Sequence, residues 1–252
     1  MNIFRTKFKG EIVAEFVMPK KPSNKVLILC GGMPGYPEKS RYESLFDIYT
    51  KKGFWIFVPR YRGSWESGGL MFKKSPHKDI QDVIDELETG FVELWAGQKY
   101  VIKNPEIVLV GGSFGGPAVL LNSKDSRVKK VIAFSPVLDW REEKNTIEPI
   151  PKLAQFVSDA FACGYRIARN GWQKIEEGKL YNPATEQEKI DGSKCLIIHA
   201  KDDEVVSAKP LESFVKAVGP KLILVAKGGH MGSRYLVEKR FSKKCSDFLK
   251  SK

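Results

Sequence analysis

The stretch from Asn104 to Pro117, NPEIVLVGGSFGGP, constrains the fold of this chain more than any other. Its apolar residues Ile107–Val110 run without a polar interruption into a glycine-rich turn, and a helix-compatible segment follows. A continuous apolar run of this length is typical of a strand that is buried on both faces of a parallel sheet. The stretch therefore predicts a strand, a sharp turn and a helix in the interior of an α/β protein.

At this turn, Gly111, Ser113 and Gly115 match the pattern G-x-S-x-G. In that pattern the serine is a nucleophile, strained and exposed at the carboxyl end of the strand. The glycines leave room for the neighbouring strand and helix, which a β-carbon would meet. A glycine-rich turn that binds a phosphate, or that only packs, has a similar composition. Ser113 is thus the first candidate catalytic residue.

Other apolar runs of strand length alternate with amphipathic helical segments. They are found at Lys25–Cys30, Trp55–Val58, Lys130–Phe134, Cys195–His199 and Leu222–Ala226. This alternation predicts a mostly parallel, doubly wound α/β sheet, whose functional residues lie at the carboxyl ends of the strands. Ile3–Phe8 and Glu11–Met18, joined around Gly10, predict an N-terminal antiparallel hairpin.

The alternation lapses between about Asp139 and Asn182. Apolar residues at helical spacing predict one helix around Leu153 and Phe161, and a second near Trp172. We interpret residues 139–182 as a small helical cap or lid inserted into a single domain that spans residues 1–252. A chain of 252 residues is long enough for one large domain of this kind.

A serine nucleophile needs a base and a carboxylate that orients the base, and the chain has only three histidines. His77 lies in the first turn of an expected helix, so we expect it at the surface or as a cap. His230, in the glycine-rich loop KGGHMG after the last expected strand, is the candidate base. His199 ends the preceding strand, and the acidic loop after it offers Asp202 and Asp203 as the carboxylate.

Attack of the serine on an acyl group also requires two N–H donors for the oxyanion. One is expected to be the amide of Phe114, directly after the nucleophile, and the other to lie in the loop Gly31–Gly35. A tight turn with no such role is the alternative for this loop. Four aromatic residues are candidates for an acyl or leaving-group pocket: Tyr36, Trp65, Trp140 and Phe161.

Composition argues against several other functions. The net charge is +12, but the lysines are spread along the whole chain, so we expect no nucleic-acid partner. The chain contains no apolar run of the length of a transmembrane helix and no apolar signal-peptide core, so we expect no membrane span and a cytoplasmic location. The four cysteines form no C-x-x-C pair, and we expect neither a metal nor a cofactor.

From about Lys25 to Lys250 the chain resembles the α/β-hydrolases. Within them it is most similar to the catalytic domain of the prolyl oligopeptidase-like serine hydrolases, which include dipeptidyl and acylaminoacyl peptidases and related esterases. The resemblance is carried by four segments, YRGS at 61–64, GSFGG at 112–116, SPVLDW at 135–140 and HAKDDEVV at 199–206. It implies an α/β-hydrolase fold.

The resemblance also implies roles for individual residues. The order nucleophile, acid, base falls on Ser113, Asp203 and His230. In the family the acid usually lies four residues after the histidine that ends the strand, which favours Asp203 and leaves Asp202 as the alternative. The family commonly has His-Gly-Gly-Pro at the oxyanion loop, where this chain has Gly-Gly-Met-Pro, so the second amide donor is expected at Met33.

The peptidases of this family carry a large β-propeller before the hydrolase domain, where this chain has a short hairpin. The resemblance therefore implies a serine hydrolase that cleaves carboxylic esters or short acyl compounds through an acyl-enzyme. One alternative is an aminopeptidase or acylpeptide hydrolase with a short peptide substrate, for which Glu142, Glu143 and Glu148 are candidates to bind a free amine. Another is a catalytically silent binding protein. The sequence leaves the oligomeric state open.

Overall fold

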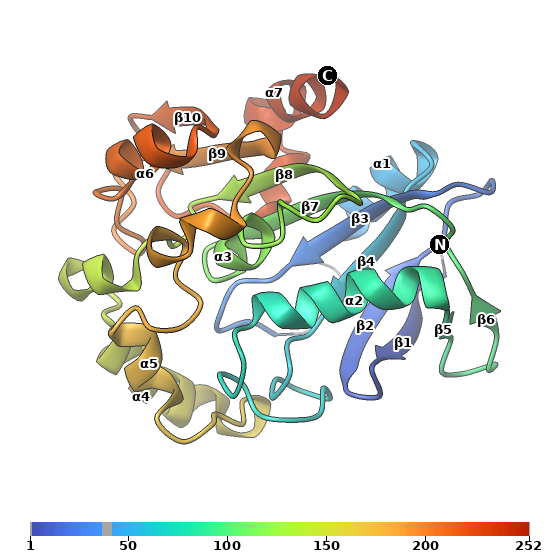
Figure 1. Cartoon of the computed structure of the whole chain (residues 1–252), viewed down its shortest axis with the longest axis horizontal. Helices are drawn as coiled ribbons and strands as arrows, with labels where there is room; N and C mark the ends of the chain where they lie inside the picture. The colour runs from blue at the N-terminus through green and yellow to red at the C-terminus, as the bar shows by residue number, and fades with distance from the viewer. Residues whose placement is uncertain (1, 37–41, 252) are drawn as a thin grey trace.

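A mixed sheet of eight strands forms the centre of the computed structural model, which describes residues 2–36 and 42–251 (Figure 1). The strands are β1 (Phe4–Phe8), β2 (Ile12–Val17), β3 (Lys25–Cys30), β4 (Trp55–Pro59), β7 (Glu106–Gly112), β8 (Val128–Phe134), β9 (Cys195–Ala200) and β10 (Lys221–Val225). Their order across the sheet is β1-β2-β4-β3-β7-β8-β9-β10. A separate pair, β5 (Phe91–Val92) and β6 (Lys99–Tyr100), forms a small second sheet.

Strand direction follows the prediction. The strands β1 and β2 form the N-terminal antiparallel hairpin, β2 is antiparallel to β4, and every pair from β4 to β10 is parallel. Since Cys30 pairs with Gly111 and Ala200 pairs with Val225, the loops that follow these strands start at the same edge of the sheet. The predicted α/β architecture is confirmed, and the strand boundaries agree with the predicted ones to within two residues.

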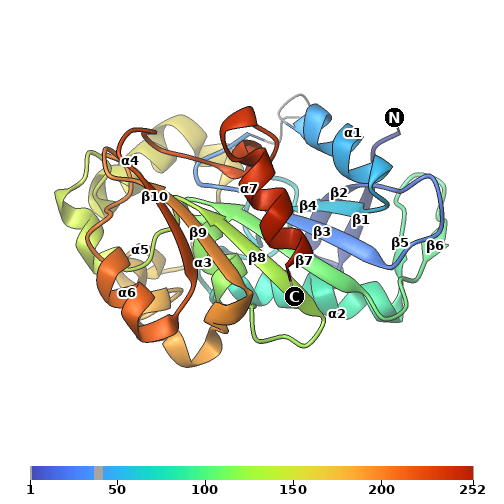
Figure 2. The same cartoon turned by 90° about the horizontal axis from the view of Figure 1, so that it is seen from above.

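Helices cover both faces of the sheet (Figure 2). On one face, α2 (His77–Thr89), α3 (Gly115–Leu120) and α6 (Leu211–Val218) contribute to the larger core. On the other, α1 (Glu43–Lys51) and α7 (Lys239–Lys250) form a second core with alternate side chains of the same strands. Because successive side chains of a strand point to opposite faces, Val26, Ile28 and Cys30 enter the first core, while Leu27 and Leu29 enter the second.

The remaining helices connect or flank these layers. Within residues 139–182 the structure has η2 (Trp140–Asn145), α4 (Ile150–Phe161), η3 (Ala162–Gly164) and α5 (Gly171–Glu176). The short turns that follow are η4 (Pro183–Thr185), η5 (Gln187–Lys189), η6 (Gly192–Lys194) and η7 (Ser233–Leu236). In Figure 1, α4 and α5 lie together at the end of the molecule away from the β1–β2 hairpin. The helix predicted around Leu153 and Phe161 is therefore present as α4.

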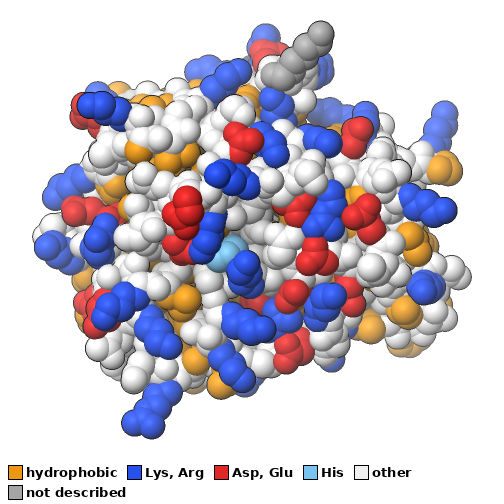
Figure 3. All heavy atoms as spheres, viewed as in Figure 1, with side chains coloured by type: hydrophobic (Ala, Val, Ile, Leu, Met, Phe, Trp, Pro, Cys, Tyr) orange, Lys and Arg blue, Asp and Glu red, His pale blue; other side chains and the backbone are white. Residues whose placement is uncertain are grey.

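Surface charge and helix length bear on possible partners. On the face drawn in Figure 3, Lys and Arg side chains are distributed across the surface and interspersed with Asp and Glu. Among the helices of residues 2–36 and 42–251, none has the length and apolar character needed to cross a membrane.

Candidate active site

Ser113 lies on the turn between β7 and α3, with a left-handed backbone at φ +54°. Non-glycine residues rarely adopt this conformation, and it persists where the surroundings enforce it. A β-carbon on Gly111 would lie 2.3 Å from the carbonyl oxygen of Gly115, and one on Gly115 would lie 2.2 Å from that of Cys30. The glycines of the motif are therefore required by the close approach of helix and neighbouring strand, as the sequence pattern predicts.

His230 and Asp203 come together from two neighbouring loops. His230 follows β10 and Asp203 follows β9, and Nδ1 of His230 lies 3.0 Å and 3.2 Å from the two carboxylate oxygens of Asp203. The amides of Val205 and Val206 each donate to Oδ1 of Asp203 at 3.0 Å. Because a carboxylate only accepts, Nδ1 of His230 donates to it, which leaves Nε2 free to accept a proton.

The environment of Asp203 favours its charged form. Burial raises the pKa of this carboxyl, but the hydrogen bond and charge of His230 and the amide of Val206 together bring the pKa below its ordinary value. The side chain of Asp203 is fully buried, while that of His230 is 27% exposed. An anionic carboxylate behind a partly exposed imidazole is the arrangement that orients a general base.

Asp202, the alternative carboxylate, has different partners. Its Oδ1 accepts hydrogen bonds from the amides of Gly228 and Gly229, at 2.8 Å and 2.9 Å. These hydrogen bonds lower the pKa of the exposed Asp202 carboxyl. Asp202 therefore fixes the backbone of the loop that carries His230, while Asp203 contacts the imidazole itself.

Ser113 and His230 line the same cleft, whose volume is about 550 Å³. Within the described ranges, no hydrogen bond joins the hydroxyl of Ser113 to the imidazole. In unliganded enzymes such bonds are often long and tighten when substrate binds. The arrangement therefore presents a hydroxyl and an oriented imidazole to one space.

Of the two expected oxyanion donors, Met33 lines the same cleft as Ser113, and Phe114 directly follows Ser113 in the chain. The amides of Met33 and Phe114 donate no hydrogen bond within the part of the chain that the structure describes, so both are available to a ligand. Gly32 packs directly against the nucleophile, since a β-carbon there would lie 3.5 Å from Cβ of Ser113.

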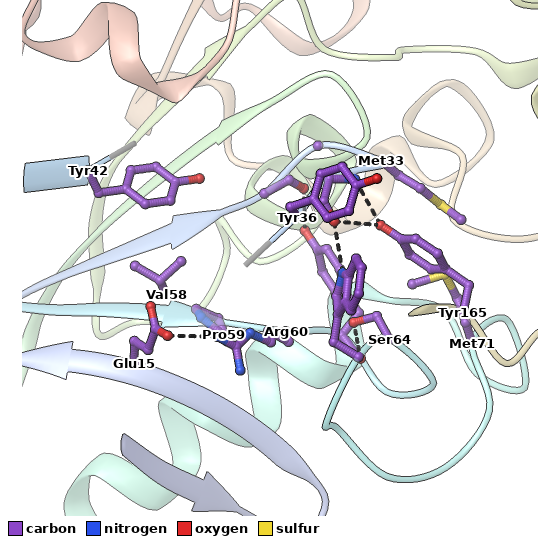
Figure 4. A pocket seen from close by; sticks show the side chains of 15 residues that line it. Glu15, Met33, Tyr36, Tyr42, Val58, Pro59, Arg60, Ser64, Met71 and Tyr165 are labelled. Atoms are coloured by element: carbon purple, nitrogen blue, oxygen red, sulfur yellow. Dashed lines mark hydrogen bonds and ion pairs between the residues drawn. The ribbon is translucent and has the colours of Figure 1, made fainter. Parts of the chain in front are cut away.

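The four aromatic residues predicted to line a pocket lie in three different places: the cleft, a neighbouring pocket and the core. Tyr36 and Phe161 line the cleft, and their ring centroids are 4.9 Å apart. Trp65 lines a smaller neighbouring pocket of about 70 Å³, and its ring centroid lies 5.5 Å from that of Tyr36. Tyr36 also lines this pocket, as Figure 4 shows. Trp140 lines neither pocket: it is 4% exposed, and its indole N–H donates to the carbonyl of Tyr181 at 2.7 Å. Trp140 therefore belongs to the core.

Some cleft residues were not predicted from the sequence. Phe156, on α4, lines the cleft and is 49% exposed. Arg234, just after the histidine loop, also lines it. A large apolar residue on an exposed helix face, such as Phe156, indicates a binding surface. To recognise it, one must know which face of the helix is exposed, and the periodicity of the sequence does not give this.

The three glutamates that were candidates for amine binding differ in their positions relative to the cleft. Glu148 lines the cleft and forms no ion pair with the described residues. Glu142 does not line it. Glu143 is buried, and its Oε2 accepts from the amide of Ser207 at 3.0 Å while Oε1 has no partner among the described residues. Burial, together with the nearby Asp203, raises the pKa of Glu143 to about 7.

The other two histidines do not reach the cleft. His199 is buried at the end of β9, where Nδ1 donates to the carbonyl of Ala200 at 3.0 Å, and burial lowers its pKa. His77 was expected either at the surface or as a helix cap, and the structure excludes the surface position. His77 is 3% exposed and bonded through Nδ1 to the hydroxyl of Ser75. Within the described residues there is no cluster of three or more His, Cys, Asp or Glu that could hold a metal ion.

Comparison with known proteins identifies the family. Residues 40–251 match the sequence model of the prolyl oligopeptidase family. The search of curated proteins gave no match. Similar solved structures include Est1E from Butyrivibrio proteoclasticus, with 18% identity, a TM-score of 0.65, and coverage of 99% of this chain and 98% of that one.

Two further structures share the fold. The esterase Pf2001 of Pyrococcus furiosus has 14% identity and a TM-score of 0.67, over 99% of this chain and 89% of its own. The acylaminoacyl peptidase of Pyrococcus horikoshii has 18% identity and a TM-score of 0.64, over 98% of this chain and 41% of its own. Because the family match extends over most of the sequence, this chain belongs to the prolyl oligopeptidase family and is a serine hydrolase with the α/β-hydrolase fold.

Proposed function

We propose that this serine hydrolase cleaves carboxylic esters through an acyl-enzyme, with Ser113 as nucleophile, His230 as base and Asp203 as the acid that orients the base. One observation carries the proposal. His230 is held by the buried Asp203 at 3.0 Å and lines the same cleft as Ser113, which sits on a strained turn. These are the parts that acyl transfer to a hydroxyl requires.

The reaction begins when Oγ of Ser113 attacks the ester carbonyl and Nε2 of His230 takes the hydroxyl proton. The negative charge moves to the carbonyl oxygen, where the amides of Met33 and Phe114 stabilise it. Collapse of this intermediate breaks the ester bond, and His230 gives its proton to the departing alkoxide. A water molecule, deprotonated by His230, then attacks the acyl-enzyme and releases the carboxylic acid and the serine.

The side chains that line the cleft suit an ester with an apolar or aromatic acyl group. Tyr36, Phe156 and Phe161 form an aromatic wall on one side of it. Pf2001 is an esterase, and Est1E has been solved with ferulic acid, an aromatic carboxylic acid, bound. Our chain spans 98% of the length of Est1E and 41% of the acylaminoacyl peptidase. The aromatic lining of the cleft and the ferulic acid bound to Est1E support an ester of an apolar or aromatic acid as the substrate.

We also propose that residues 139–182 act as the cap of a single domain. Glu148, Phe156 and Phe161 all come from this segment and line the cleft. Variation here would change the acyl or leaving group that fits, while the nucleophile and the base stay on the sheet loops.

Labelling with a fluorophosphonate tests the proposal, because the reagent needs a working nucleophile, base and oxyanion hole but little specific binding. Peptide mass spectrometry is expected to find the label on Ser113 of the wild type and to find none on His230→Ala. Circular dichroism of both proteins controls for folding. Folded wild-type protein that takes up no label would contradict the proposed mechanism and favour a binding protein.

A second candidate function is an aminopeptidase, which Glu148 favours because its carboxylate lines the cleft without an ion partner among the described residues. If it binds a free amine, Glu148→Gln should raise KM for an amino-acid p-nitroanilide about tenfold, as expected for loss of a charge-assisted hydrogen bond. KM for p-nitrophenyl acetate, which has no amine, should stay the same.

Glu142→Gln is the matched control, since Glu142 is a neighbouring carboxylate that does not line the cleft. An equal KM for the nitroanilide in all three proteins would rule out Glu148 as the amine site. Absence of nitroanilide cleavage by the wild type, with esterase activity intact, would rule out the aminopeptidase.

A further inference from the structure

The loop Gly31–Gly35, which carries the amide of Met33, is held by side chains at both of its ends (Figure 4). At the start, the hydroxyl of Tyr61 donates to the carbonyl of Gly31 at 3.3 Å. At the end, the indole N–H of Trp65 donates to the carbonyl of Gly35 at 2.8 Å. The amide of Gly35 donates to the hydroxyl of Tyr165 at 3.0 Å. Both backbone groups of Gly35 are thus satisfied by aromatic side chains.

The segments that carry Trp65 and Tyr165 are joined through their backbones, in an antiparallel bridge between Ser64 and Tyr165. The amide of Trp65 donates to the carbonyl of Gly164 at 2.7 Å, and the amide of Arg166 donates to that of Gly63 at 2.7 Å. A β-carbon on Gly164 would lie 3.0 Å from the indole of Trp65, so the absence of a side chain there lets the indole approach the backbone. The loop after β4 and residues 164–166 of the proposed cap therefore form one unit.

The backbone of Trp65 shows that this unit is constrained. Trp65 has a φ of +47°, a conformation that is unfavourable for a non-glycine residue and persists only where the surrounding contacts enforce it. Its ring also contacts those of Tyr36 and Tyr165, with centroids 5.5 Å and 6.2 Å away. Such strain is often found where a residue is held for function.

We propose that Trp65 and Tyr165 are positioning residues of the oxyanion hole, which hold Gly35 so that the amide of Met33, two residues earlier, faces the reacting carbonyl. The inference rests on the proposed function, because it takes Met33 as an oxyanion donor. A donor displaced by about 1 Å can cost as much as a hundredfold in rate. Tyr165 belongs to the proposed cap, so the cap would contribute to the chemistry as well as to substrate fit.

The hydroxyl of Tyr165 is suited to a fixed structural contact. Burial raises its pKa, so it stays protonated and uncharged through the working range of a histidine base. A neutral hydroxyl accepts the Gly35 amide and keeps its own proton to donate, and the Gly35 carbonyl lies 3.4 Å away. The hydrogen bond between the Gly35 amide and the Tyr165 hydroxyl is therefore kept whether His230 is protonated or neutral.

Tyr165→Phe and Trp65→Phe test the inference, because both keep an aromatic ring: the first removes the contacts of the hydroxyl with the amide and carbonyl of Gly35, and the second removes the indole hydrogen bond to that carbonyl. We expect kcat for p-nitrophenyl acetate to fall about tenfold in each variant and about a hundredfold in the double variant. KM should change little. Affinity for trifluoroacetophenone, which forms a tetrahedral adduct with an oxyanion on the serine, should weaken by the same factors as kcat.

Tyr100→Phe is the matched control, since it removes the hydroxyl of another half-buried tyrosine, on β6 and outside the cleft. It should keep the kcat and inhibitor affinity of the wild type. Unchanged kcat and trifluoroketone affinity in both test variants would overturn the inference, as would a loss confined to KM. Fluorophosphonate labelling of the wild type separates this failure from failure of the proposed function: a labelled Ser113 leaves the mechanism standing.

Discussion

Replacing Ser113 by alanine, or His230 by alanine, is expected to lower kcat for an activated ester by about six orders of magnitude. The two groups act as a unit, because the hydroxyl is a weak nucleophile until the imidazole takes its proton. Removing both should therefore cost hardly more than removing one. The residual rate above that of the ester in buffer should come from the amides of Met33 and Phe114 and from binding in the cleft.

Steady-state turnover of p-nitrophenyl acetate measures this effect, with the wild type and the double variant prepared in parallel. Alanine, like serine, is strained in the left-handed backbone conformation that position 113 adopts. The Tm of Ser113→Ala must therefore be compared with that of the wild type as well. A Ser113→Ala protein that is folded and retains more than about one thousandth of the wild-type kcat would show that the nucleophile is elsewhere.

The turn and the sheet could be predicted because their causes are local in the sequence. The run Ile107–Val110 is apolar throughout since both faces of β7 are covered, and the glycines around Ser113 reflect close contacts along the same strand–helix unit. Parallel strands bring their carboxyl ends to one edge. A sequence search for histidines and carboxylates directly after strands therefore led to His230 and to the pair Asp202 and Asp203. The family resemblance favoured Asp203, and the structure brings that residue into contact with His230.

Contacts between loops could not be predicted in this way. Gly35 and Tyr165 are separated by 130 residues, and no periodicity relates them. For the same reason Trp65 and Trp140 looked equivalent as aromatic residues after strands, although one contacts the oxyanion loop and the other is buried against Tyr181. Burial of an ionisable residue is equally non-local: Glu143 was a candidate for the cleft, but η2 turns it toward the amide of Ser207.

The same limit applies to the cap. Its helices could be predicted from apolar spacing, but the direction of their outer face could not, so Phe156 was not among the predicted cleft residues. Two tyrosines of this segment contact the turns that carry the proposed oxyanion donors: Tyr165 at Gly35, and Tyr181 at the carbonyl of Phe114, 2.5 Å away. Deleting residues 139–182 would therefore disturb both proposed oxyanion donors and not only the fit of the substrate.

The adjacent aspartates provide a sharp test of the acid, because they lie in one loop and contact different partners. Asp203→Ala is expected to lower kcat about ten-thousandfold, since His230 loses the carboxylate that fixes its tautomer and stabilises its cation. Asp203→Asn should cost a similar factor, because an amide keeps the shape but can hold the wrong tautomer. The loss should be smaller than for Ser113→Ala, since the nucleophile and the imidazole remain.

Asp202→Ala is the matched control for these variants. It removes the acceptor for the amides of Gly228 and Gly229 and leaves the contact between His230 and Asp203 intact. We therefore expect a kcat close to that of the wild type and a slightly lower Tm, because the histidine loop is less well held. The opposite result, a ten-thousandfold loss in Asp202→Ala with an active Asp203→Ala, would move the acid by one residue. It would also mean that the loop rearranges when substrate binds, since in this structure Asp203, and not Asp202, contacts the imidazole.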